Sequence, residues 1–119
     1  MSMKLSELLE EYQAISTFLN EEWPLQDKNH RTFARMMKLF EELGELSDEI
    51  LTSMNLQRSS KVAKFSQTNV EDEFADVLAS VLLLAIELEV DVEEVIKRKI
   101  DFTKERFGMS EDDESNSSR

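Results

Sequence analysis

Two pairs of acidic residues have the spacing of metal ligands on helices. Glu42 and Glu45 lie in the segment "EELGEL" (residues 41–46), and Glu73 and Asp76 lie in "EDEFADVL" (residues 71–78). On a helix, side chains three residues apart project from the same face within one turn. The two carboxylates of each pair therefore repel each other unless a positive charge lies between them.

An acidic helix face is most often simply solvated, and that interpretation stays open for the first pair. The second pair opens an apolar helix, and residues 65–96 contain no lysine or arginine that could neutralise it locally. Burying an unpartnered carboxylate costs several kcal/mol. A divalent cation held by oxygen, Mg²⁺ or Mn²⁺, would offset this charge. Gly44, between the first two acids, would let a phosphate or another backbone come close.

Composition narrows the remaining classes of protein. The chain has 119 residues, a formal net charge of −12, no cysteine and a single histidine, His30, so any metal site must use oxygen ligands. The negative charge argues against binding to duplex nucleic acid. No apolar run is long enough to cross a bilayer, and the start of the chain lacks the layout of a signal peptide. We expect a soluble, cytoplasmic protein that does not bind membranes.

Hydrophobic periodicity predicts four helices and no strands. The first helix ends before Pro24, the third is capped by Asn69, and the fourth is capped by Asp91 and stops at Gly108. We therefore predict an all-α protein with a four-helix, bundle-like domain over residues 1–108 and an acidic, disordered tail over residues 109–119. The predicted elements are helices at 5–19, 32–54, 70–90 and 91–108, a connector at 20–31 and a loop at 55–67.

The third helix is apolar around nearly its whole circumference, so we expect it to be buried on almost every side. Its narrow polar strip consists of Glu73, Asp76, Ser80 and Glu87. A protomer of this size has too few helices to cover such an element. A second copy of the chain would supply the missing cover, through a two-fold axis. On the second helix, the predicted apolar side consists of Phe33, Met36, Met37, Phe40, Leu43, Ile50 and Leu51.

Together, the two acid pairs resemble the MazG-like family of the all-α nucleoside triphosphate pyrophosphohydrolases. The family pattern is E-x-x-E on one helix and E-x-x-D on the next, matched here by Glu42 and Glu45 and by Glu73 and Asp76. The resemblance covers roughly residues 30–107. It implies Mg²⁺ held by these four acids, with Mn²⁺ as a substitute, and cleavage of a (deoxy)nucleoside triphosphate into the monophosphate and pyrophosphate. It also implies a homodimer or a dimer of dimers.

The resemblance extends to residues around the acids. Glu41 resembles a further family acid, which either helps to deprotonate the attacking water or binds another metal, unless it is an ordinary surface residue. Lys38 shares the face of Glu42, and Lys99 and Arg106 lie where the family carries basic residues, so each is a candidate phosphate contact or a solvated cation. Trp23 would either stack on a base or cover the first helix.

Other functions fit the same residues. The family commonly has an asparagine near the end of the domain, where "KIDFTKERF" offers only Asp101 or Thr103, so base and sugar recognition stays open. A dUTPase-like or phosphoribosyl-ATP-cleaving enzyme of the same superfamily would have the same metal site. A non-catalytic helical dimerisation module would explain the helices and the charge, but not why Glu73 and Asp76 enter the apolar helix together.

Overall fold

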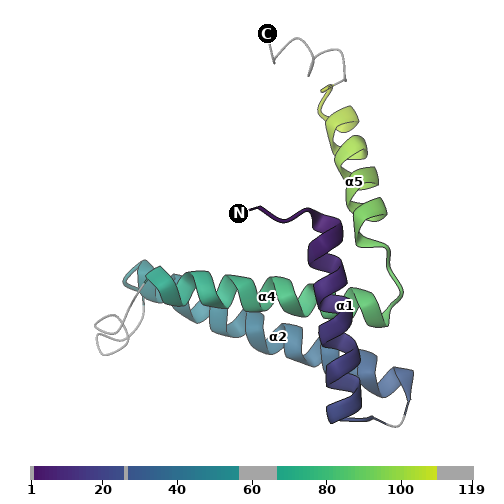
Figure 1. The fold of residues 1–119 in the computed structure, drawn as a ribbon. Coiled ribbons are helices and arrows are strands. Elements are labelled where there is room, and N and C mark those ends of the chain that lie inside the picture. Colours follow the sequence, from purple (N-terminus) through teal and green to yellow (C-terminus); the bar gives the residue numbers. More distant parts are fainter. Residues whose placement is uncertain (1, 26, 57–66, 110–119) are drawn as a thin grey trace. The chain divides into compact units, whose positions relative to one another are not determined.

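The computed structural model describes residues 2–25, 27–56 and 67–109, and within these ranges the protein is all-α, as predicted, with helices and no strand. The chain divides after Glu89 into two units, of which the first contains three of the helices and the second contains α5. The predicted tail, from residue 110 onward, and most of the predicted loop lie outside the described residues. The helices are α1 (Leu5–Glu22), α2 (Lys28–Ser53), α4 (Gln67–Glu87) and α5 (Val92–Arg106) (Figure 1).

Three of the predicted boundaries are confirmed by the backbone. Helix α1 ends before Pro24, and α5 begins after Asp91, whose Oδ1 accepts a hydrogen bond from the Glu94 backbone N–H at 3.1 Å. Gly108 follows the end of α5 with a φ of 72°, a left-handed conformation that favours glycine. Local capping chemistry was sufficient to define these helix ends.

Three other boundaries differ from the prediction. Helix α2 begins at Lys28, inside the predicted connector, because Asp27 caps it by accepting from the His30 backbone N–H at 2.9 Å. Asn69 is not an N-cap; it lies inside α4, which begins at Gln67, and Gln67 and Asn69 are exposed, so their polar side chains are tolerated there. Helix α4 ends at Glu87 rather than at residue 90, since Glu89 has a φ of 57°, which a continuing helix does not allow.

Helices α2 and α4 lie side by side and run antiparallel (Figure 1). At one end of their contact, Arg31 pairs with Glu87. Eleven residues further along α2 and eleven residues back along α4, Glu42 faces Asp76, and three residues beyond that Glu45 faces Glu73. We call these six residues the polar seam. At the Arg31 end of the seam, a positive and a negative side chain offset each other. At the Glu45 end, all the side chains are acidic.

The buried surface of the first unit differs from the predicted one. Helix α4 is not buried on every side, because Leu78 and Val81 are exposed, at 47% and 41% of their surface. Its most buried positions include Ser80 and Glu87, which belong to the strip predicted to be polar. The predicted apolar side of α2 is exposed as well, with Phe40 at 60%. In the described part of this single chain, the helices thus meet through a partly polar surface and leave large apolar side chains uncovered.

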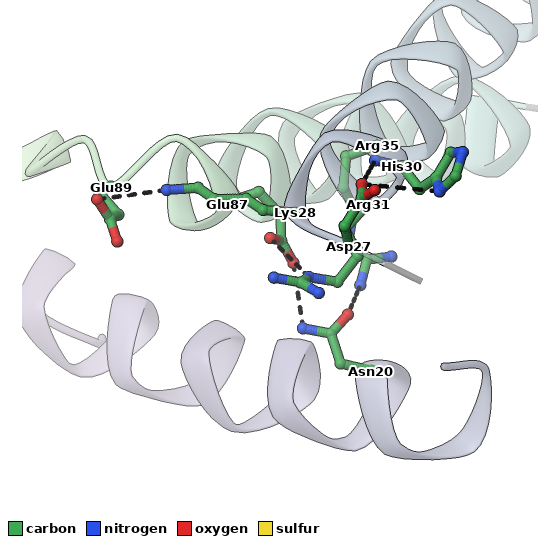
Figure 2. Close-up of polar contacts among 8 residues, drawn as sticks. All are labelled: Asn20, Asp27, Lys28, His30, Arg31, Arg35, Glu87 and Glu89. Atoms are coloured by element: carbon green, nitrogen blue, oxygen red, sulfur yellow. Dashed lines mark hydrogen bonds and ion pairs between the residues drawn. The ribbon is translucent and has the colours of Figure 1, made fainter. Parts of the chain in front are cut away.

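Helix α1 packs on α4 through a small residue and a polar bridge. Ser16 is 1% exposed, and a small side chain lets helices approach closely. One turn later, Asn20 Nδ2 donates to Glu87 Oε1 at 3.1 Å, and Asn20 Oδ1 accepts from Arg35 Nη2 at 3.0 Å (Figure 2). Asn20 therefore connects α1 to both other helices of the unit.

No helix in the described ranges combines the length and apolar character that crossing a membrane requires.

The ion pair between Arg31 and Glu87 should stabilise the first unit. Arg31→Met would leave the Glu87 carboxylate, 6% exposed, without its cation, and should lower the free energy of unfolding by about 2 kcal/mol. This is below the usual cost of a stranded buried charge because Arg31 is itself 30% exposed. Urea unfolding at one fixed protein concentration measures the change.

Lys28→Met is the matched control, because it removes an ion pair with Glu89 whose side chains are 49% and 81% exposed. Its cost should stay within about 0.5 kcal/mol. Equal losses in the free energy of unfolding for the two variants would show that the burial of Glu87 does not increase the contribution of its ion pair to stability.

Candidate metal centre

Three of the four predicted metal ligands meet at the acidic end of the polar seam. Glu42, Glu73 and Asp76 each offer a carboxylate oxygen, and these atoms all lie within 4.8 Å of one another. Glu42 is buried, Glu73 is half-buried and Asp76 is exposed, so the cluster runs from the helix contact out to solvent. Glu45 does not belong to this set of three, but its carboxylate lies near enough to Glu73 to raise the pKa of that residue.

The surroundings of Glu73 disfavour the ionised form of its carboxyl group. Burial, followed by the nearby Glu45, Asp76 and Glu42, raises the pKa of Glu73 from its ordinary value of 4.5 to about 7. Without a metal, the charged form of Glu73 is therefore disfavoured.

Lys38 offsets part of the remaining charge. Its Nζ lies 3.1 Å from Glu42 Oε1 and 3.3 Å from Glu41 Oε1. These contacts, first with Glu42 and then with Glu41, raise the pKa of Lys38 above its ordinary value. Lys38 and Glu41 are both exposed. The structure therefore places these two predicted site residues next to Glu42, on the solvent side of the cluster.

The residues present fit a divalent cation. Glu42 Oε2 and Glu73 Oε2 are buried and have no hydrogen-bond partner among the described residues. Such orphaned oxygens are costly, and carboxylate oxygens are the ligands that Mg²⁺ and Mn²⁺ prefer. The interpretation of Glu42 as part of a solvated face is wrong, because it is 6% exposed.

Gly44 has open space around it. A Cβ at this position would meet no heavy atom within 4 Å, so no described element of the protomer needs the glycine for a close approach. The prediction that another backbone of the protomer comes near is not supported there. Room for a phosphate remains.

The other predicted substrate contacts come from α5 and from the end of α1. Lys99 and Arg106 belong to α5, where their charged groups lie 5.2 Å and 5.4 Å from the centres of the Phe102 and Phe107 rings. Trp23 follows the end of α1 and lines a cavity with residues at the start of α2.

Sequence reasoning missed Arg31, Arg35 and Asn20 as members of a network. With Lys38 and Glu42, the two arginines follow one another at intervals of three and four along α2, which is the signal of a continuous helix face. This helix face is hidden in the sequence because the predicted connector at residues 20–31 includes Arg31. Recognising Asp27 as a cap would have extended the stripe by a turn.

Comparison with known proteins places these acids within a family. The family model described as the MazG-like family matches residues 36–118, a range that contains all four predicted metal ligands. Neither the curated proteins nor the solved structures yield a match.

The raised pKa of Glu73 predicts how stability depends on pH in the absence of metal. The folded protein holds this proton more tightly than the unfolded chain, so the contribution is fully present below about pH 4.5 and is lost as the pH rises through about 7. In EDTA, the free energy of unfolding should therefore fall between about pH 5 and pH 8. Glu73→Gln should make this fall shallower.

Glu71→Gln provides the control, since Glu71 is an exposed glutamate of the same helix. It should keep the wild-type dependence on pH. If Glu73→Gln kept it as well, the proton would be held elsewhere.

Proposed function

Because the chain belongs to the MazG-like family, we propose that it is a nucleoside triphosphate pyrophosphohydrolase that depends on Mg²⁺, with Mn²⁺ as a substitute. It splits a (deoxy)nucleoside triphosphate between the α- and β-phosphates and yields the monophosphate and pyrophosphate. One observation carries the proposal: the oxygens of Glu42, Glu73 and Asp76 converge within 4.8 Å, and these residues come from the two acid pairs of the family pattern.

Each acid has a distinct part in this proposal. Glu42, Glu73 and Asp76 hold the cation, and Glu45, which lies close to Glu73, contributes a fourth carboxylate. When bound, a divalent cation neutralises the triphosphate and lowers the pKa of a coordinated water. The orphaned oxygens of Glu42 and Glu73 are then satisfied, which removes the cost of burying them.

Lys38 and Glu41 act at the edge of the site. Their ion pair leaves Glu41 on the solvent side, where it accepts a proton from the attacking water or contributes a further oxygen to a metal. Lys38 is shared between two carboxylates, so it reaches a phosphate only by giving up one of these contacts. Lys99 and Arg106 remain proposed phosphate contacts from α5.

In this proposal, a second copy of the chain covers the apolar surface that one protomer exposes. The apolar side of α2 exposes Phe33, Met36, Met37, Phe40 and Leu43. Exposed apolar surface of this extent on adjacent helical turns is typical of an interface between subunits. We therefore propose a homodimer or a dimer of dimers.

Asp76→Asn should nearly abolish cleavage. The amide keeps the shape of the side chain and removes its charge, so metal binding and the stabilisation of the transition state weaken together, and pyrophosphate release should fall about 100-fold or more. The melting temperature without metal should hold or rise, because one of several repelling carboxylates is gone. The measurement is pyrophosphate release from a panel of NTPs and dNTPs, dUTP and phosphoribosyl-ATP included, with Mg²⁺.

Asp72→Asn is the matched control, because it makes the same substitution on an exposed turn of α4 outside the acid cluster. It should keep wild-type turnover. Wild-type turnover by Asp76→Asn with an unchanged dependence on Mg²⁺ would show that the site is assigned to the wrong residues. A wild-type protein inert toward the whole panel would favour the dimerisation module instead.

The proposed assembly makes its own prediction. Light scattering at micromolar concentration should give two or four times the chain mass of 13.8 kDa. Phe40→Glu, which places a charge on the exposed apolar side of α2, should shift the protein toward the monomer. A well-folded wild-type monomer would refute the assembly.

A further inference from the structure

A cavity of about 240 Å³ lies where the end of α1 meets the start of α2. Its walls combine an aromatic ring and two leucines with the polar groups of the network in Figure 2. All of its lining residues precede residue 36, so it lies outside the range that matches the family. They are Leu19, Asn20, Trp23, Leu25, Arg31, Ala34 and Arg35.

Arg35 brings an uncompensated positive charge to this cavity. The Arg31 guanidinium pairs with Glu87 at 3.2 Å, whereas Arg35 has no ion pair with any described residue. Its hydrogen bond is the one from Nη2 to Asn20 Oδ1, and its Nε is buried without a partner among the residues described. A guanidinium has five N–H groups, so a half-buried one that makes this single hydrogen bond has N–H groups left to donate.

The polar wall of the cavity offers donors rather than acceptors. Asn20 already accepts from Arg35 through Oδ1 and donates to Glu87 through Nδ2, so both ends of its amide are engaged (Figure 2). Arginine carries five N–H donors and no acceptor. The apolar wall includes Trp23, which is 67% exposed and presents a flat ring. A planar ring with hydrogen-bond acceptors along one edge matches both walls.

The cavity also lies at a suitable place relative to the acids. Arg35 and Glu42 are seven residues apart on α2, two turns along the same face, which is about 10 Å along the helix axis. A nucleotide extends in this way between its phosphates and its base. The two sites can therefore hold opposite ends of one molecule.

We propose that this cavity binds the base of the nucleotide, and that Arg35 favours a base with two adjacent acceptors. Guanine presents O6 and N7 to an arginine, whereas adenine presents an N6 amino donor beside N7. The identity of the ligand as a nucleotide rests on the proposed function, whereas the cavity and the unpaired arginine do not. Arg35 is thus the residue that sets base preference.

Trp23 reports directly on the cavity, because it is the sole tryptophan of the chain. Its fluorescence is recorded during titration with guanosine and with adenosine in EDTA, since nucleosides carry no phosphate for the acids to repel. The wild type should show a saturable change with guanosine and bind it about tenfold more tightly than adenosine. Arg35→Met should bind the two nucleosides equally.

Two further variants separate recognition from folding. Ala34→Leu fills the cavity while leaving Arg35 and its hydrogen bond in place, and should weaken both nucleosides about tenfold or more. Arg98→Met, the control, removes an exposed arginine of α5 and should change neither affinity. Melting temperatures identify any variant that fails to fold. If Arg35→Met does so, Arg35→Lys, which keeps the charge and loses the planar fork, takes its place with the same expected loss of preference.

The outcomes distinguish the cavity from the enzyme. Absence of a saturable signal with guanosine, equal affinity of the wild type for the two nucleosides, or a preference that survives loss of the Arg35 fork would each overturn the proposal. Guanosine binding by a protein that releases no pyrophosphate from any triphosphate would leave the cavity assignment standing and refute the proposed function. Pyrophosphate release without a Trp23 response would support the proposed function and refute the cavity assignment.

Discussion

The contact between α2 and α4 buries carboxylates, and the arrangement of the first unit follows from how their charge is offset. At one end of the polar seam, Arg31 neutralises Glu87, and Asn20 connects this pair to α1. At the other end, no described lysine or arginine lies within 4 Å of Glu73 or Asp76, and Lys38 reaches only Glu42 among the seam acids. Between the same two helices, the buried carboxylate at one end is therefore neutralised by a protein cation, whereas the other end keeps an excess of negative charge.

This imbalance accounts for the chemistry proposed for the acidic end. A protein selected for stability alone would replace Glu73 or Asp76 with a neutral residue, because like charges brought together at a helix contact oppose folding. The retained charge is useful if a cation enters. The orphaned oxygens of Glu42 and Glu73 mark the place where that cation fits.

The sequence was informative where local chemistry decides the structure. The spacing of Glu42, Glu45, Glu73 and Asp76 indicated two facing acid pairs, and the caps at Asp91 and Gly108 marked the ends of α5. The buried side of α2 could not be found in this way. Periodicity assigns burial to the side with Phe40, but α4 packs instead on the side with Glu42, because pairing between helices depends on partners far apart in sequence. The network around Arg35 was missed for the same reason, since Asn20 and Glu87 are separated by 67 residues.

The central claim is that the acidic end of the polar seam is a divalent metal site, and anomalous diffraction from crystals grown with Mn²⁺ tests it most directly. The account predicts an anomalous peak bounded by the carboxylates of Glu42, Glu73 and Asp76, with Glu45 turned toward it. A well-ordered cluster without a peak at millimolar Mn²⁺, with Lys38 still paired to Glu42, would contradict the account.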